Sequence, residues 1–277
     1  MKVILANIRG FCPGVRAAIQ KAEDALAQSD DAVASLGPLI HNNDEVRRLE
    51  QAGLKVAEST DQVEAGQVVI RSHGVAPEVI GRLKQRGLEV VDATCGLVKR
   101  LHQAAQELAD EGRQVVIVGR QDHPEVQAVL GYVPEAVVVA NPEDLEAKAA
   151  EARLGVVIQT TESPDHLSRI LEAIVQGDFG DLRVINTLCK ESCRRQQAAV
   201  ALCAQVDIMF VLGGLHSANT TQLAHLCREH NPQTYHLESV KDLDPALLRG
   251  KTTVGVTAGA STPDWVIEAF VQRLQEI

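Results

Sequence analysis

The sequence predicts an α/β protein built from three similar lobes, each with a mainly parallel sheet. Three observations lead to this fold class. Apolar runs of strand length alternate with runs of helical period along the whole chain. Most of the apolar runs lack the alternation of a half-exposed strand, which is typical of parallel strands buried on both faces. A cysteine-bearing turn of one kind occurs three times, at Cys12, Cys95 and Cys189.

Nine segments are expected to form strands, and helical runs of about ten to fifteen residues follow many of them. This order of strand, turn and helix predicts right-handed crossover connections. The strand segments are 3–8, 68–72, 90–94, 115–119, 136–140, 155–160, 183–188, 208–213 and 253–259.

The three cysteines divide the chain into stretches of similar length, so we expect lobes of similar size. Lobe 1 is expected in residues 14–95, lobe 2 in 96–189 and lobe 3 in 190–277. The N-terminal strand in 1–13 is a candidate member of the third lobe.

Composition argues against several classes of protein. The formal net charge is −10, which disfavours nucleic acid or an anionic membrane surface as a partner. No apolar run approaches the roughly 20 residues of a membrane helix. The N-terminal apolar run leads into a Cys-Pro-Gly turn without a small-residue cleavage site, so we interpret it as a strand. Six cysteines in 277 residues do not suggest a disulfide framework, and we expect a cytoplasmic protein.

Polar residues follow the other strands in the same position as the cysteines. In parallel α/β sheets, ligands bind at the carboxyl ends of the strands. These residues lie in six turns, and the three cysteine turns bring the total to nine polar turns, three in each lobe. All nine could face one centre. The residues are His41, His73, His123, Glu125, Thr160, Thr161, Ser217, Asn219 and Ser261.

Each of these residues taken alone has a structural explanation. A single histidine is commonly a satisfied surface or core residue, as we expect for His102, His166, His225, His230 and His236. Glu125 could be a carboxylate in the first turn of a helix. Thr160, Ser217 and Ser261 could be N-caps.

The three cysteines in similar turns indicate a metal centre. A cysteine at a helix start meets the positive end of the helix dipole, which favours the metal-binding thiolate. Pro13 after Cys12 suits the first helical position. Three thiolates could hold a metal with one open coordination position, and both zinc and an iron–sulfur cluster fit this ligand set.

The other three cysteines do not share this context. Cys203 and Cys227 have apolar neighbours at helical spacing and are expected in the core. Cys193 follows Cys189 by four positions and would share its helix face. No third cysteine lies close by, so this pair is a weak indication of a local metal site.

The ordered motifs resemble one known family. The stretches "GFCPGV", "SHGV", "DATC", "HPEV", "QTT", "SANT" and "GVTAGAS" occur in the order found in 4-hydroxy-3-methylbut-2-enyl diphosphate reductases. The resemblance covers nearly the whole chain. It implies a trefoil of three α/β lobes around a central [4Fe–4S] cluster, held by Cys12, Cys95 and Cys189 with one open iron.

The resemblance also implies an activity. The family removes the allylic hydroxyl of its diphosphate substrate as water, using two electrons from ferredoxin or flavodoxin and two protons. The products are isopentenyl and dimethylallyl diphosphate. By resemblance, Glu125 delivers a proton and Thr160 lies beside the substrate hydroxyl. The diphosphate ligands implied are His41, His73, His123, Ser217, Asn219 and Ser261.

Several positions depart from the family pattern. Gly96 stands where proline is common, and Cys193 occupies a variable position. Arg120 and Asp122 replace residues of a Gly-His-Ala-Gly segment, His216 replaces asparagine, and Ala218 replaces a serine. Two alternatives follow: a related cluster enzyme that acts on another substrate or leaving group, and a non-catalytic redox sensor.

Overall fold

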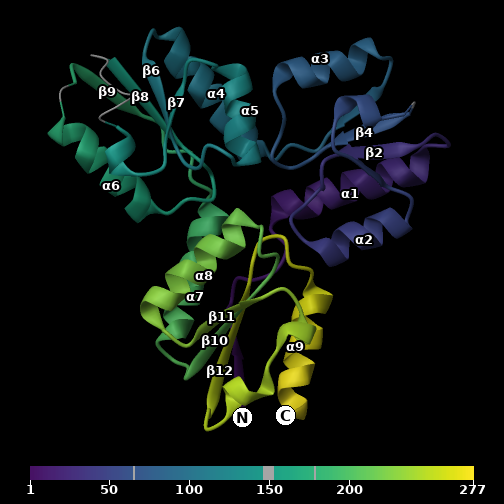
Figure 1. Cartoon of the computed structure of the whole chain (residues 1–277), viewed down its shortest axis with the longest axis vertical. Helices are drawn as coiled ribbons and strands as arrows, with labels where there is room; N and C mark the ends of the chain where they lie inside the picture. Colours follow the sequence, from purple (N-terminus) through teal and green to yellow (C-terminus); the bar gives the residue numbers. More distant parts are fainter. Residues whose placement is uncertain (65, 146–152, 178) are drawn as a thin grey trace. The chain divides into compact units, whose positions relative to one another are not determined.

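The computed structural model describes residues 1–64, 66–145, 153–177 and 179–277. Across these residues the strands form three four-stranded sheets in which every strand pair is parallel. The three-lobed α/β class with parallel sheets is therefore confirmed (Figure 1).

Sheet A has the order β1 (Lys2–Leu5), β12 (Thr253–Ala258), β10 (Ile208–Leu212), β11 (Thr234–Leu237). Sheet B has β3 (Lys55–Ala57), β2 (Val33–Leu36), β4 (Gln67–Ile70), β5 (Glu89–Asp92). Sheet C has β7 (Val137–Val139), β6 (Gln114–Val118), β8 (Arg153–Ile158), β9 (Asp181–Val184).

The three sheets share one topology. In sheets B and C, the strand that comes first in the sequence lies inside the sheet, between the second strand, at one edge, and the third strand. The fourth strand pairs with the third and forms the other edge. Sheet A has the same order, but its outermost strand is β1, which pairs with β12 from Lys2 opposite Thr253 to Leu5 opposite Val256. The two ends of the chain therefore build one sheet together.

The chain divides into two compact units, which are described separately. The A unit contains Met1–Arg16, Ile40–Arg48 and Lys190–Ile277, and it holds sheet A. The BC unit contains Ala17–Leu39 and Leu49–Cys189, and it holds sheets B and C.

Helices follow the strands in a regular manner. Short 3-10 segments follow β3, β7 and β11, at Thr60–Gln62, Pro142–Asp144 and Val240–Asp242, and another lies at Pro245–Leu248. The α-helices follow the remaining strands. They are α1 (Pro13–Gln28), α2 (Asn43–Gln51), α3 (Pro77–Gln85), α4 (Gly96–Asp110), α5 (Pro124–Tyr132), α6 (Pro164–Gln176), α7 (Lys190–Cys203), α8 (Ala218–His230) and α9 (Asp264–Glu276).

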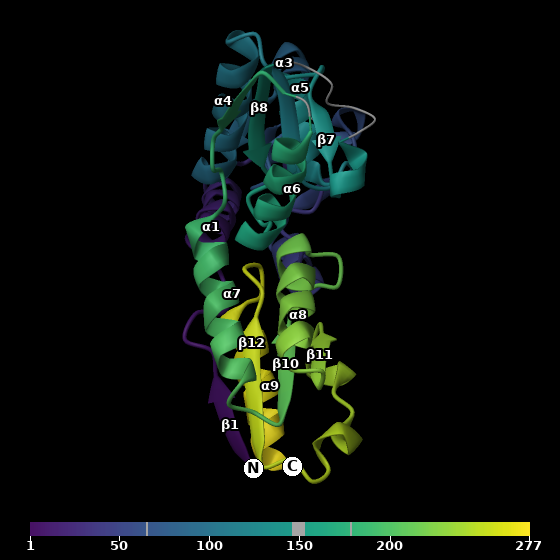
Figure 2. The same ribbon diagram turned by 90° about the vertical axis from the view of Figure 1, so that its left-hand side faces the viewer.

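Sheet A is buried on both faces. From β10, Phe210 packs with Phe270 of α9, while the next residue, Val211, packs with α7 and α8 on the opposite face. Figure 2 shows α7 and α8 beside the strands of this sheet. Cys203 and Cys227 belong to the second cluster and are 3% and 0% exposed. The prediction that both are core residues is confirmed.

Sheet C is covered in the same way. Leu101 and Leu108 of α4 pack with Ile117 on one face, and Ile170 of α6 packs on the other. The start of α3 and the end of α5 approach each other closely, because a methyl group on Gly131 would lie 2.2 Å from Cβ of Ala76. Glycine is therefore required for this contact within the BC unit.

All nine predicted strand segments contain a strand, although most strands end before the polar residues of the following turn. The prediction missed β2, β3 and β11 because they are short and carry polar residues such as Ser35, Lys55 and His236. Within the described ranges, every helix is too short or too polar to cross a membrane.

Candidate active site

The predicted polar turns have the expected position. Each lies between a strand and the α-helix that follows it, at most four residues before the first helical residue. The turns and the helices that follow are Cys12 before α1, His41 before α2, His73 before α3, Cys95 before α4, His123 before α5, Thr160 before α6, Cys189 before α7, Ser217 before α8 and Ser261 before α9. The carboxyl ends of each sheet therefore gather three of the predicted residues.

The cysteine turns follow a particular strand of each sheet. They follow β1, β5 and β9, which are all outermost strands. After Cys95 the chain leaves sheet B, and α4 packs on sheet C. After Cys189 it leaves sheet C, and α7 packs on sheet A. The cysteines thus mark the places where the chain passes to another sheet, whereas after most other turns it returns to the sheet it left.

A backbone hydrogen bond joins each cysteine turn to its neighbouring polar turn. The N–H of each cysteine donates to a carbonyl at, or one residue before, a predicted substrate residue. The pairs are Cys12 N to Ala260 O at 3.0 Å, Cys95 N to Ser72 O at 3.0 Å and Cys189 N to Thr160 O at 2.9 Å. The backbone of each lobe therefore fixes a cysteine beside a residue expected to meet the substrate.

The three thiols have the chemistry of an iron–sulfur ligand set. None of the three forms a disulfide, all are partly buried, and each directly precedes the first residue of a helix. The sulfur of Cys12 accepts the N–H of Val15 at 3.4 Å, so the thiol acts as a helix cap. The positive end of a helix stabilises a thiolate. The donor set therefore suits iron bound through sulfur.

The three cysteines are divided between the two units. Cys12 belongs to the A unit, and Cys95 and Cys189 belong to the BC unit. Within the described part of the chain, no three His, Cys, Asp or Glu side chains are grouped closely enough to hold a metal ion. Cys193, on α7, is also partly buried and forms no disulfide.

Glu125 and Thr160 form a buried pair in the BC unit. The Thr160 hydroxyl donates to Oε2 of Glu125 at 2.9 Å, and the Thr160 N–H donates to Oε1 at 2.6 Å. Glu125 is 2% exposed. Burial raises the pKa of Glu125 to about 7, although the two hydrogen bonds from Thr160 act in the opposite direction. The carboxyl group can therefore both hold and release a proton near neutral pH.

His123 and His73 lie beside this pair. His123 is the N-cap of α5, and its Nδ1 accepts the N–H of Glu125 at 3.2 Å. Because Nδ1 accepts this bond, Nε2 is the ring nitrogen that can carry a proton and donate. The rings of His73 and His123 are 5.7 Å apart in an edge-to-face arrangement. Four predicted site residues thus belong to one cluster.

The A unit brings His41 and Ser261 together. The Ser261 hydroxyl donates to the His41 carbonyl at 3.2 Å. Gly214 also lies against this carbonyl, because a methyl group there would be 2.5 Å from the oxygen. The backbone of the His41 turn is therefore held from two sides.

Asn219 joins helix α7 to the turn before α9 through its amide group. Its Nδ2 donates to Oγ of Ser192 at 3.1 Å, and its Oδ1 accepts the N–H of Ala260 at 3.0 Å. Ala260 also accepts from Cys12. The Asn219 side chain therefore supports the turn that carries Ser261.

The N-cap alternative holds for one of the three hydroxyl residues. Ser217 caps α8 by accepting the N–H of Thr220 at 3.4 Å. Thr160 and Ser261 are not caps, because Ser163 precedes α6 and Pro263 precedes α9 in that role. Their hydroxyls bond to Glu125 and His41 instead.

The residues that depart from the family pattern are mostly at the surface. Arg120 and Asp122 form a two-point ion pair, with Nη2 and Oδ2 at 2.8 Å and Nε and Oδ1 at 3.2 Å. The Arg120 N–H donates to Oε1 of the buried Gln159 at 3.1 Å. His216 is exposed, and Ala218 is the first residue of α8.

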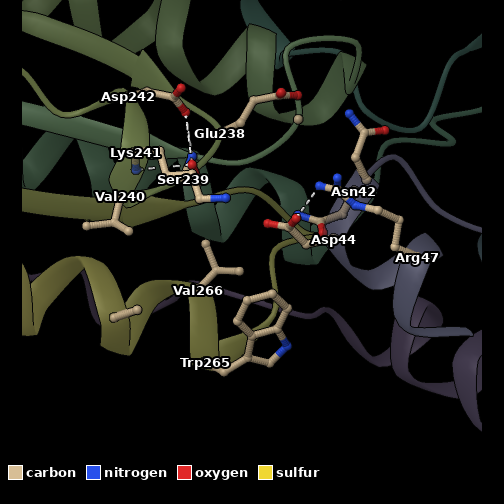
Figure 3. A pocket seen from close by; sticks show the side chains of 13 residues that line it. Asn42, Asp44, Arg47, Glu238, Ser239, Val240, Lys241, Asp242, Trp265 and Val266 are labelled. Carbon is tan, nitrogen blue, oxygen red and sulfur yellow. Dashed lines mark hydrogen bonds and ion pairs between the residues drawn. The ribbon is translucent and has the colours of Figure 1, made fainter. Parts of the chain in front are cut away.

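The A unit also contains a polar pocket that none of the predicted site residues lines (Figure 3). Its volume is about 330 Å³, and its lining includes Asn42, Gly214, Glu238, Lys241 and Trp265. Asn42 follows His41 directly. The pocket therefore adjoins the His41 turn without including its imidazole.

Two buried residues were not predicted to take part in the site. His102 lies beneath the His73 turn, and Nη1 of Arg195 donates to the Ala258 carbonyl at 2.7 Å. His102 was expected to be a satisfied surface or core histidine, and Arg195 belongs to an Arg-Gln pair of the family pattern to which no role was assigned.

The fold and the clusters define a class of protein: a three-lobed parallel α/β protein with thiols, imidazoles and a buried acid at its strand ends. The family model described as "LytB protein" matches residues 3–275, and the chain belongs to this family. The predicted family and enzyme class are confirmed.

Curated relatives cover the chain from end to end. A 4-hydroxy-3-methylbut-2-enyl diphosphate reductase of Pelobacter propionicus is 43% identical over 278 residues, which are 100% of this chain and 99% of the relative. The enzyme of the same name from Aquifex aeolicus is 41% identical over 279 residues, with coverage of 99% and 96%.

Two solved structures are similar over the whole chain. One is titled as (E)-4-hydroxy-3-methyl-but-2-enyl diphosphate reductase, the terminal enzyme of the non-mevalonate pathway, with 40% identity, a TM-score of 0.74 and full coverage of both chains. The reductase from Plasmodium falciparum has 28% identity and a TM-score of 0.94, covering 99% of this chain and 88% of its own.

Proposed function

We propose that this protein reduces 4-hydroxy-3-methylbut-2-enyl diphosphate. Two electrons and two protons replace the allylic C–O bond with a C–H bond and release the hydroxyl as water, giving isopentenyl and dimethylallyl diphosphate. The observation that carries this proposal is the buried Glu125–Thr160 pair beside His123. Full-length similarity to reductases of that name supports the substrate.

The proposed cofactor is a [4Fe–4S] cluster held by Cys12, Cys95 and Cys189, with its fourth iron open to substrate. The three cysteines form no disulfide and lie at helix starts, which supports this ligand set. When bound, such a cluster supplies electrons and a Lewis-acidic iron. Cys193 is not included, because the other two cysteine turns have no equivalent of it.

The diphosphate is proposed to bind to side chains at the helix starts. Nε2–H of His123 can donate to a phosphate oxygen because Nδ1 already accepts from Glu125. Helix N-termini add backbone N–H groups and a favourable dipole. The remaining proposed ligands are His41, His73, Ser217, Asn219 and Ser261.

Glu125 is proposed to deliver the proton, with Thr160 as its partner beside the substrate hydroxyl. A carboxyl group with a pKa of about 7 can be protonated at neutral pH and can transfer its proton. The Thr160 hydroxyl, 2.9 Å from Oε2, is within reach to share that proton. The Thr160 N–H holds the other oxygen and fixes the orientation of the carboxyl group.

We also propose ferredoxin or flavodoxin as the electron donor and the cytoplasm as the compartment. None of the six cysteines, all of which lie within the described ranges, forms a disulfide, which suits a reducing compartment.

A second proposal is a related cluster enzyme with another substrate. The Arg120–Asp122 ion pair, one residue before His123, favours it because it adds two charges to the expected edge of the substrate site. Under this proposal the cluster and Glu125 keep their roles, and the leaving group differs. A redox sensor is a weaker alternative, because it would not need the buried acid and its imidazole neighbours.

Anaerobic reconstitution with iron and sulfide tests the first proposal. Iron is counted, turnover of the allylic diphosphate is assayed with a chemical reductant, and substrate titration is followed by EPR. We expect four irons per chain by the proposed cluster type, turnover, and a substrate-dependent spectrum. A complete cluster without turnover would favour the second proposal, and bound zinc in place of iron would refute the redox chemistry.

A further inference from the structure

His102 is a buried polar residue that the proposed mechanism does not use. It belongs to α4, which begins directly after Cys95, and it is 4% exposed. Among the described residues, its Nε2 has no hydrogen-bond partner. Burial lowers its pKa to about 4, so the imidazole is neutral at physiological pH. A buried nitrogen atom without a hydrogen-bond partner destabilises the folded state. A histidine kept at such a position is therefore expected to have a specific role.

The flat ring of His102 fills a narrow space. It stacks on the ring of Tyr132, at the end of α5, with 4.5 Å between ring centres and an angle of 27°. A methyl group on Gly74 would lie 2.9 Å from its Cε1 and 3.5 Å from its Nε2. Gly74 has a φ of +72°, which favours glycine independently. The His102 ring therefore contacts both the His73 turn and α5.

The turn above His102 carries two functions. The Gly74 N–H donates to the Arg71 carbonyl, which closes the turn, and His73 lies within it. The Ser72 carbonyl accepts the N–H of Cys95. A shift of this turn toward or away from the His102 ring would therefore move His73 relative to His123, whose ring is 5.7 Å from that of His73.

We propose that His102 is a positioning residue for diphosphate binding: its ring, held against Tyr132, supports the Arg71–Gly74 turn and sets the position of His73. The inference rests on the proposed role of His73 as a diphosphate ligand. His102 itself does not touch substrate.

The test measures binding of inorganic pyrophosphate to the cluster-loaded protein by anaerobic calorimetry, so that no turnover is needed. His102→Ala is expected to weaken pyrophosphate roughly tenfold, because the turn loses its support. In steady-state assays the KM for the allylic diphosphate should rise about as much while kcat changes by less than about threefold. Iron content should remain that of the parent protein.

A matched control separates positioning from general loss of stability. Leu108→Ala lies on the same helix and also removes a buried side chain. It should lower the melting temperature and leave pyrophosphate affinity unchanged. If both variants lost affinity equally, His102 would be only a structural residue and the proposal would be wrong.

A double-mutant cycle tests the contact itself. Gly74→Ala alone should also weaken binding, because its methyl group collides with the ring. Combined with His102→Ala, part of that collision disappears, so the losses should be less than additive. Additive losses would overturn the proposal.

If His102→Ala does not fold, His102→Leu is used, because it keeps apolar volume without a flat ring. It should weaken pyrophosphate about threefold, and unchanged affinity would overturn the proposal. A parent protein that binds pyrophosphate but does not reduce the allylic diphosphate would refute the proposed reaction and leave the positioning role standing. A parent protein that does not bind pyrophosphate would refute the positioning role.

Discussion

Thr160 bonds to both carboxyl oxygens of Glu125, through its N–H at 2.6 Å and its hydroxyl at 2.9 Å. The two residues are 35 positions apart. Glu125 lies in α5, which follows β6, and Thr160 lies in the turn after β8, the neighbour of β6 in sheet C. The same Thr160 accepts the N–H of Cys189 through its carbonyl. One residue therefore links the buried acid to a proposed cluster ligand.

The Glu125→Gln variant is expected to lose turnover because glutamine cannot release a proton. We expect kcat to fall by about 10² to 10⁴, with iron content and pyrophosphate affinity close to those of the parent. In the parent, kcat/KM should fall as pH rises through about 7, where the pKa of Glu125 lies. Turnover that is unchanged in the glutamine variant would remove Glu125 from the mechanism.

Thr160→Val is expected to move this pH dependence. The Thr160 hydroxyl bond favours the carboxylate and lowers the pKa of Glu125, so its removal should raise that pKa further. The fall in rate should shift to higher pH, and Thr160→Ser should restore the original profile. The measurement is the pH profile of kcat/KM for the three proteins, and an unshifted profile in the valine variant would contradict the proposed pairing.

The pH dependence of unfolding should report the same buried acid. Glu125 has a pKa of about 7 in the folded chain against an ordinary value of 4.5. Between these values the unfolded chain releases a proton that the folded chain retains, so the stabilising contribution of protonated Glu125 is lost as pH rises. Relative to Glu125→Gln, the unfolding free energy of the parent should fall by about 3 kcal/mol between pH 4.5 and 7.

His102 changes the unfolding free energy with pH in the opposite direction to Glu125, because its pKa is about 4 in the folded chain and 6.5 ordinarily. Its contribution is present above pH 6.5 and is lost as pH falls toward 4. Parent and glutamine variant share this effect, so their difference isolates Glu125. Denaturant titrations of the metal-free chains at several pH values provide the measurement, and a pH-independent difference would contradict the raised pKa.

The cysteine variants should divide into two groups. Cys189→Ser, like the serine variants of Cys12 and Cys95, is expected to lose most bound iron after reconstitution, since a hydroxyl is a poor ligand for iron in this setting. Cys193→Ser should keep its iron and its EPR signal. Loss of iron from the Cys193 variant would make it a fourth ligand and would exclude an open iron.

Ala218→Ser restores the hydroxyl that the family pattern places there. We expect a KM for the allylic diphosphate lower by about tenfold, the lower limit for one added hydrogen bond to a charged group. Trp265→Ala is the control, because Trp265 is 48% exposed and lines the separate pocket of the A unit. A raised KM in the serine variant would indicate that the altered edge serves another substrate.

The order of strand, polar turn and helix could be predicted from the amino-acid sequence. These features are local: apolar runs predict strands, and Pro13 after Cys12 predicts a helix start within one turn. The nine polar turns could be predicted for that reason. The short strands β3 and β11 could not, because their few residues acquire strand character only by pairing with a neighbour.

Contacts between residues remote in sequence, and the burial of polar groups away from water, depend on the folded chain and could not be predicted. The pairing of β1 with β12, the two bonds from Thr160 to Glu125 and the ring of His102 against Gly74 all join residues remote in sequence. The raised pKa of Glu125 follows from burial, which packing of the whole lobe creates. Local sequence patterns do not show which groups become buried. Glu125 could therefore be predicted as the acid from the sequence, whereas its raised pKa depends on the tertiary structure.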